Sequence, residues 1–452
     1  MVSRDAIGSA ERQFGQKLSQ ALAPLGFLWA SAGLAAVLGA LAQIMFARQL
    51  GASGYGVLVT ASAMANLLGP FAACGVGLML MQKHGREGWL AHRWVGPSLR
   101  LYGLCTAIAF VLFASWALAA METTSHRVAA MLLIPLVAAF GAIQLAESRF
   151  QLEHRYANVA RWQLTKHASI FVVAAATLAG GWTLLGAAAG LFAISVGVAA
   201  FAFWAGAGMA RGEFALKGHG PRPAPSADKV APDLKTVLSE AWPFAATSFG
   251  FLLFFQSSVA VVQAVAGTHA AGIYGLAVSI MTAAYLLPRI LYRKFFLAKV
   301  SRWHFHDQSK VRAFVWRLVP AVAVLSIPLA AFIVLAAPLL VDRVFGAEFA
   351  GTVPVLQILA MALPLRFISS GLAVAAVETH HVRERVFWQF GLAIAVVLAT
   401  WAALPHYGLT GAAAVMVCGE AALAATYWLL AVRNAGEAAS IGGAVAARRA
   451  QE

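Results

Sequence analysis

Long apolar runs recur along the whole chain and are separated by short polar segments. A helix of about 20 apolar residues is needed to cross a hydrocarbon layer about 30 Å thick. Because the runs do not alternate between apolar and polar residues, they predict helices rather than barrel strands. Twelve segments can be drawn, at about 24–47, 55–81, 98–120, 128–146, 167–185, 187–209, 241–266, 273–291, 318–341, 353–377, 386–405 and 409–431. The pattern therefore predicts an all-α polytopic membrane protein.

The composition supports this prediction. Hydrophobic residues make up 61% of the 452 residues and charged residues 11%, whereas soluble domains have about 45–50% and about 25%. This excludes a soluble enzyme, a secreted disulfide scaffold and a disordered chain. The cysteines Cys74, Cys105 and Cys418 lie apart in apolar segments and have no metal or redox spacing. They are therefore interpreted as small buried hydrophobic residues.

The positions of the basic residues predict the topology. The chain has 33 Lys and Arg against 18 acids, and 28 of the 33 fall in cytoplasmic segments if the N-terminus is cytoplasmic. The turns on the other side hold only Arg48, Arg127 and Arg343. Basic residues are enriched in cytoplasmic loops, so we expect both termini to be cytoplasmic. The net charge of +15 is then explained by the basic residues of the cytoplasmic segments. We therefore expect no nucleic-acid partner.

The polar segments also predict the domain organisation. A cytoplasmic N-terminus (1–23) precedes an N-lobe of six helices (24–209). A cytoplasmic linker with four prolines (210–240) leads to a C-lobe of six helices (241–431), and a cytoplasmic tail (432–452) follows. The first apolar run is too long for the core of a signal peptide, so we expect it to remain as a transmembrane helix.

A short internal repeat supports the division into two halves. Residues 52–56 read Ala-Ser-Gly-Tyr-Gly and residues 271–275 read Ala-Gly-Ile-Tyr-Gly, an offset of 219 that also maps Pro24 onto Pro243. Six helices in each half give both halves the same orientation, which is a parallel repeat about an axis along the membrane normal. Two such bundles predict a central cavity and an alternating-access transporter.

Four short segments resemble a known family. They are 47–56 (Ala-Arg-Gln-Leu-Gly-Ala-Ser-Gly-Tyr-Gly), 344–349 (Val-Phe-Gly-Ala-Glu-Phe), 356–360 (Leu-Gln-Ile-Leu-Ala) and 406–413 (His-Tyr-Gly-Leu-Thr-Gly-Ala-Ala). Their order and spacing on a twelve-helix layout are similar to those of bacterial polysaccharide flippases (O-antigen and exopolysaccharide) in the multidrug/oligosaccharidyl-lipid/polysaccharide exporter superfamily. The chain departs from the lipid II exporters of that group, which look longer by two helices.

The resemblance implies a flippase of undecaprenyl-pyrophosphate-linked oligosaccharide in the bacterial inner membrane, acting in surface polysaccharide biosynthesis. It also implies two six-helix lobes that open alternately to the two sides. The expected partners are the lipid-linked oligosaccharide, the bilayer, a polysaccharide polymerase and the chain-length machinery. No cofactor is expected.

Two charges fall near the middle of predicted helices, Arg366 in the tenth and Glu420 in the twelfth. Each costs about 2.5–3.5 kcal/mol at the bilayer centre on insertion scales, so both should face protein or water. One interpretation is a structural salt bridge. The other places Arg366 in the cavity as a partner of the substrate pyrophosphate, because a guanidinium binds two phosphate oxygens at once. Glu420 would then exchange protons and couple transport to an ion gradient.

Three further cations lie at helix ends and are also candidates for phosphate binding. Arg48 ends the first helix, where extension of its side chain to the interface is the alternative role. Arg100 and Arg289 lie at cytoplasmic helix ends, where a purely topogenic role is the alternative.

Uncharged polar and aromatic residues are candidates for sugar contacts, with hydrogen bonding between helices as the alternative for the polar ones. Among the aromatic residues, Trp29, Phe255 and Tyr285 are candidates to stack on sugar rings. The polar candidates are Gln43, Asn66, Gln144, Gln256 and Gln263.

Other chemistry has little support in the sequence. The segments 304–307 (His-Phe-His-Asp) and 378–381 (Glu-Thr-His-His) lack a complete ligand set at zinc spacing, so no metal site is expected. No phosphate-binding loop or nucleophile elbow appears, and an enzyme is not expected. The alternatives to a flippase are a cation-coupled multidrug exporter of the same fold, a polysaccharide polymerase or ligase, and a non-transporting scaffold.

Overall fold

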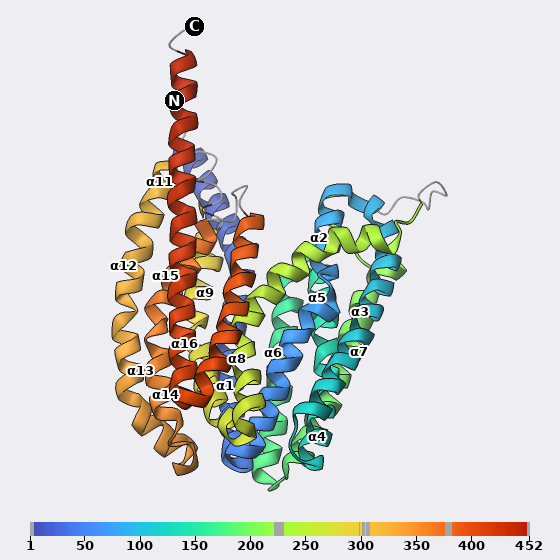
Figure 1. Ribbon diagram of the computed structural model, residues 1–452. Helices are drawn as coiled ribbons and strands as arrows, with labels where there is room; N and C mark the ends of the chain where they lie inside the picture. The colour runs from blue at the N-terminus through green and yellow to red at the C-terminus, as the bar shows by residue number, and fades with distance from the viewer. Residues whose placement is uncertain are drawn as a thin grey trace. The chain divides into compact units, whose positions relative to one another are not determined.

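The computed structural model describes residues 4–220, 230–297, 299–300, 303, 308–375 and 382–449. In this part of the chain every regular element is a helix (Figure 1), which confirms the predicted all-α class. The longer helices are α1 (Arg4–Ala73), α2 (Val76–Glu87), α3 (Val95–Ala120), α4 (Thr124–Met131), α5 (Pro135–Leu152), α6 (Tyr156–Ala179), α7 (Leu184–Arg211), α8 (Leu234–Ala284), α12 (Val319–Leu325), α13 (Ile327–Leu340), α14 (Thr352–Ala360), α15 (Ala362–Ala375) and α16 (Val382–Arg449). Shorter turns are η1 (Gly88–Trp94), α9 (Leu286–Ile290), η2 (Leu291–Phe296), α11 (Gln308–Ala313), η3 (Phe314–Leu318), η4 (Val341–Phe345) and η5 (Ala347–Phe349).

Three of these helices each contain two of the predicted segments. Helix α1 is interrupted at Gly51, α8 at Gly267 and α16 at Gly408, and each glycine has a positive φ, of 67°, 84° and 61° respectively. This conformation strains any residue that has a Cβ atom, so glycine is required where the chain turns between two helices without a loop. The predicted pairs one and two, seven and eight, and eleven and twelve are joined in this way.

Six continuous stretches of the described residues are long and apolar enough to cross a membrane, or seven if α14 and α15 form one span bent by 42°. Several contain more than one predicted segment, as in Ser31–Ala120, so the result is consistent with twelve crossings. The fifth predicted helix, α6, is not among these stretches. Its first half carries Gln163, Lys166 and His167, which lower the mean hydropathy of the helix.

The described chain forms two compact units. Unit 1 comprises 1–46, 68–114 and 131–245, and unit 2 comprises 47–67, 115–130 and 246–452. These units differ from the predicted lobes, because two segments of the first half (47–67 and 115–130) pack with the second half. The lobe boundaries at 24–209 and 241–431 therefore stay a prediction.

Small residues allow the helices of unit 1 to pack closely. A Cβ atom on Gly206 of α7 would lie 2.6 Å from the Leu145 side chain of α5, and one on Gly77 of α2 would lie 2.9 Å from the carbonyl oxygen of Gln144. Side chains at either position would push the helices apart. Close packing of this kind stabilises helices in lipid, where burial of apolar surface adds little.

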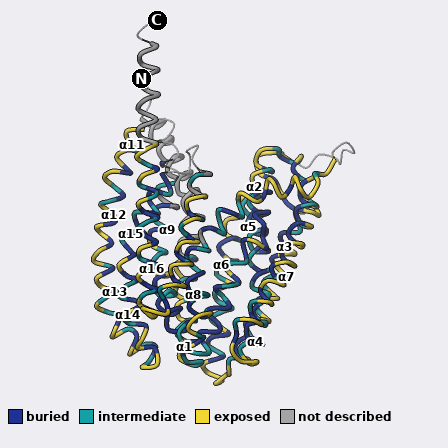
Figure 2. Tube along the Cα trace, viewed as in Figure 1, coloured by how far each residue is buried: buried dark blue, intermediate teal, exposed yellow. Residues whose placement is uncertain are grey.

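Helix α15 lies in the core of unit 2. Its Leu363 and Leu372 side chains are fully buried, together with the Tyr274 ring of α8. By contrast, Phe332 and Leu335 on α13 are 67% and 80% exposed, and Figure 2 shows such exposed positions along the outer helices of this unit. An exposed apolar stripe of this kind faces lipid in a membrane protein.

At the end of α2, unit 1 carries a polar and aromatic cap. His84 is fully buried, and its Nδ1 lies 2.8 Å from the carbonyl oxygen of Leu80. Its ring meets Phe214 edge to face, and Phe214 contacts Trp89. Trp89 in turn donates a hydrogen bond of 3.0 Å to the carbonyl oxygen of Gly220. The beginning of the predicted linker 210–240 therefore packs onto unit 1, while its residues 221–229 lie outside the described chain.

This cap predicts a pH dependence of stability. His84 lies in a segment predicted to be cytoplasmic, and burial lowers its pKa. The imidazole therefore takes up a proton at lower pH in the folded protein than in the unfolded chain. The unfolded chain takes up the proton near pH 6.5, and stability should be full above about pH 6.5 and fall as the pH drops below it. Thermal unfolding in detergent between pH 5 and 8 would measure this. The unfolding temperature of the variant His84→Gln should fall less on acidification than that of the wild type. An equal fall in both proteins would show that groups other than His84 cause the pH dependence.

Candidate functional site

The two mid-membrane charges form an ion pair inside unit 2. Arg366 on α15 places Nη1 3.2 Å from Oε1 of Glu420 on the second limb of α16. Glu420 is completely buried and Arg366 is 9% exposed. Ser369, one helical turn after Arg366, lies with Oγ 3.5 Å from the other carboxylate oxygen. Both charges therefore face protein, as the cost of exposing them to lipid requires.

Two aromatic rings also lie close to the guanidinium. The Arg366 Cζ lies 4.2 Å from the ring centre of Phe255 and 5.5 Å from that of Tyr285. The two rings meet edge to face at 5.8 Å. Cation–π contacts at such distances are worth about 2 kcal/mol or more when desolvated. Two of the three aromatic candidates thus contact the cation in this structure. The side chain of the third, Trp29, lies outside the described part of the structure.

This arrangement has two chemical consequences. The carboxylate and the aromatic faces hold a permanent positive charge in an apolar bundle, and they position its planar donors. An anion that entered would compete with Glu420 for those donors. The pair itself is observed, whereas its role in binding pyrophosphate or in coupling to protons stays a prediction.

The other predicted cations are not part of this pair. Arg48 donates from Nη2 to the carbonyl oxygen of Arg343 at 2.8 Å, and from Nε to that of Val344. Arg100 on α3 and Arg289 on α9 are exposed. Their proposed role with phosphate stays a prediction.

The polar sugar-contact candidates are distributed over both units. Gln43 and Gln144 are half-buried in unit 1, whereas Asn66 is exposed and Gln256 half-buried in unit 2. Gln263 donates a hydrogen bond of 2.6 Å to the carbonyl oxygen of Ala120. For this last residue the alternative interpretation, a hydrogen bond between helices, describes the observed contact.

The sequence interpretation missed a second polar cluster, in unit 1. The predicted cytoplasmic segment 147–166 is mostly helical, because α5 continues to Leu152 and α6 begins at Tyr156. Lys166 therefore lies ten residues into α6, about 15 Å along its axis. On the same face, Gln163 donates a hydrogen bond of 3.4 Å to Glu147 of α5. The spacing of Gln163, Lys166 and His167, three and four residues apart, is the helical signal that could have revealed this cluster.

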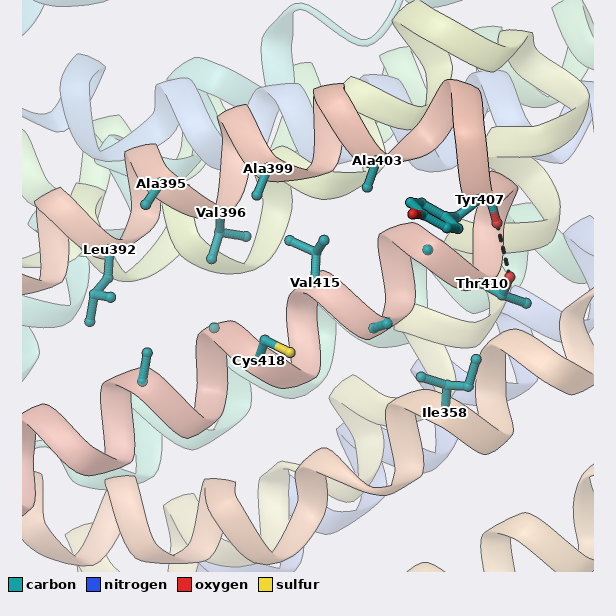
Figure 3. A pocket seen from close by; sticks show the side chains of 14 residues that line it. Ile358, Leu392, Ala395, Val396, Ala399, Ala403, Tyr407, Thr410, Val415 and Cys418 are labelled. Carbon is teal, nitrogen blue, oxygen red and sulfur yellow. Dashed lines mark hydrogen bonds between the residues drawn. The ribbon is translucent and has the colours of Figure 1, made fainter.

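An apolar groove of about 710 Å³ lies in unit 2 and is lined by residues of α14 and of both limbs of α16. Figure 3 shows the first limb of α16 on one side, the second limb with Val415 and Cys418 on the other, and Ile358 of α14 below them. Cys418 is exposed, contrary to the prediction of a buried side chain. The groove is lined by apolar and small side chains together with Tyr407 and Thr410, and by no charged one.

Metal chemistry gains no support from the described residues, in which no group of three or more His, Cys, Asp or Glu side chains is placed to hold an ion. The two histidine-containing segments, 304–307 and 378–381, lie outside the described residues.

Comparisons with known proteins agree with the fold. A structure of the lipid II flippase MurJ in an inward closed conformation is similar with a TM-score of 0.66 and 14% identity, over 90% of this chain and 87% of that chain. An inward-facing multidrug resistance MATE family transporter of the MOP superfamily is similar with a TM-score of 0.60 and 14% identity, over 88% and 94% of the two chains. Among curated proteins none matches this chain.

At such low identity these similarities show the fold alone, which this chain shares with the MurJ and MATE structures. The family model described as polysaccharide biosynthesis protein matches residues 22–287, which is more than half of the chain. This multi-pass membrane protein therefore belongs to the polysaccharide biosynthesis protein family.

Proposed function

We propose that this protein moves undecaprenyl-pyrophosphate-linked oligosaccharide across the bacterial inner membrane for surface polysaccharide assembly. Family membership supports the polysaccharide pathway, and the fold supports transport rather than covalent chemistry. The observation that carries the proposal is the buried Arg366, because a guanidinium held inside an apolar bundle is suited to recognise a phosphate group. Both termini would be cytoplasmic, as the basic residues predict.

In the proposed mechanism the pyrophosphate and Glu420 compete for Arg366. When Glu420 takes up a proton it no longer pairs with the guanidinium, which then becomes available to the incoming anion. When Glu420 releases the proton, the ion pair forms again and the anion leaves. Alternating access of the two predicted lobes would separate these two steps to opposite sides of the membrane.

A deletion strain tests the proposal. Surface polysaccharide and the leaflet location of the lipid-linked oligosaccharide are measured together. We expect loss of surface polymer with oligosaccharide retained on the cytoplasmic side, and rescue by the wild-type chain. Oligosaccharide that reaches the other side but stays short or unattached would instead indicate a polymerase or ligase. Normal polymer with new drug sensitivity would indicate the multidrug exporter, the function named for the structurally similar MATE transporter.

A further inference from the structure

Two helical turns in unit 2 share one unusual backbone conformation. Gly51 in α1 has φ 67° and ψ −179°, and Gly267 in α8 has φ 84° and ψ 177°. Each marks the point at which one helix ends and the next begins. The two glycines are 216 residues apart, three fewer than the offset of the short sequence repeat. The two turns therefore occupy corresponding places in the two halves of the chain, next to the sequence repeat.

A carboxylate from a distant part of the chain caps the helix that follows each turn. Oε1 of Glu348, in η5, accepts a hydrogen bond of 2.7 Å from the amide of Ala52. Oε1 of Glu122, between α3 and α4, accepts one of 2.8 Å from the amide of Thr268. In each case the carboxylate and the helix come from opposite halves of the chain. A negative group at a helix N-terminus is stabilised by both the unpaired amides and the helix dipole.

A second polar contact accompanies each cap, from the helix that precedes the turn. Arg48, shortly before Gly51, donates to the carbonyl oxygens of residues 343 and 344, close to Glu348. Gln263, shortly before Gly267, donates to the carbonyl oxygen of Ala120, close to Glu122. Each turn is therefore fixed by one contact from the helix that precedes it and one contact to the helix that follows it. The contacts at the first turn correspond to those at the second.

The helices that follow the two turns also touch directly. A Cβ atom on Gly56 would lie 1.8 Å from the carbonyl oxygen of Thr268, and one on Gly272 would lie 1.9 Å from that of Ala52. The hydroxyls of Ser53 and Thr268 lie 3.2 Å apart. Backbone meets backbone here, and no side chain lies between the two helices at these glycines.

We propose that Glu122 and Glu348 form a paired latch, which holds the segments 47–67 and 115–130 on the second half of the chain and must release in each transport cycle. Capping hydrogen bonds at a helix end are strong enough to favour the closed arrangement and weak enough to break reversibly. The latch lies at the turns that the basic residues predict to be periplasmic. The latch rests on the proposed function as a transporter, but it does not depend on which substrate is carried.

A reversible disulfide tests whether the segments must separate. In a chain whose three native cysteines are replaced by alanine, Ser53→Cys and Thr268→Cys are introduced together, because their hydroxyls already lie at contact distance. We expect polymer export to stop on oxidation and to return on reduction, while each single cysteine variant exports under both conditions. Normal export by the quantitatively cross-linked protein would overturn the proposal.

A labelling experiment tests the carboxylates without any need for substrate. The rate at which a membrane-impermeant thiol reagent modifies Ser53→Cys from outside is measured with and without Glu122→Gln and Glu348→Gln. We expect the double variant to label several-fold faster, and each single variant to lie between. The matched control is Glu384→Gln, which removes a carboxylate of unit 2 that pairs with Arg433 instead and should leave the rate unchanged. Equal rates for the wild-type and double-variant backgrounds would overturn the latch, whether or not the deletion strain supports the flippase.

Discussion

Replacing Arg366 with alanine should destabilise the protein by about 3–5 kcal/mol, because it leaves the fully buried carboxylate of Glu420 without its cation. The loss of the cation–π contacts with the rings of Phe255 and Tyr285 adds to this effect. We expect a marked fall in the unfolding temperature in detergent and loss of polymer export. A variant as stable as the wild type would show that the pair contributes little to the fold.

A double replacement separates stability from transport. With Arg366→Met and Glu420→Met both charges are gone, and apolar replacements of a buried ion pair are often neutral or stabilising by about 1–4 kcal/mol. We expect this variant to recover its unfolding temperature and still fail to export polymer. Recovery of both stability and export would show that the pair is purely structural, which was the alternative interpretation of the two charges.

Alanine at Gly56 should have the second large effect. Its Cβ atom would lie 1.8 Å from the backbone carbonyl oxygen of Thr268, which cannot rotate away as a side chain can. We expect destabilisation of about 3 kcal/mol or more, at or above the upper end for overpacked sites. Unfolding temperature and the yield of protein extracted in its folded form are the measurements. Gly272→Ala, which would place a Cβ atom 1.9 Å from the carbonyl oxygen of Ala52, should behave in the same way.

Gly103→Ala is the matched control for these two variants. Gly103 lies within α3, and a Cβ atom there meets no atom within 4 Å. Alanine in a helix interior should be neutral or stabilising by about 0.5–1 kcal/mol. If Gly56→Ala and Gly103→Ala proved equally stable, the backbone contact between the two turns would not be as close as the structure has it.

Much of the fold followed from the sequence because the bilayer imposes a simple rule. A segment that crosses lipid must be long, apolar and helical, so the twelve runs predicted an all-α membrane protein without any knowledge of packing. The same rule singled out Arg366 and Glu420, since a charge in such a segment needs a partner. Their pairing was one of two interpretations, and only the structure shows the 3.2 Å contact.

Contacts between distant segments were decided by the tertiary structure. Nothing in the sequence brings Glu348 to the amide of Ala52, or Glu122 to that of Thr268, because a helix N-terminus accepts any nearby carboxylate and leaves no pattern in the chain. The sequence predicted where the turn at Gly51 lies, but not that segment 47–67 packs with the second half. The sequence also does not predict the helix lengths that bring Lys166 well inside α6, since the basic segment 147–166 has the composition of a loop.

By itself, the sequence determined the class of protein, its helical segments and the two charges that most need partners, because transfer into lipid penalises each residue locally and almost independently of its neighbours. The tertiary structure alone decided which partners meet, how the glycines allow backbones to touch and which segments form each unit. Those features depend on shape and distance between residues hundreds of positions apart, and the order of residues along a single chain carries no direct measure of either.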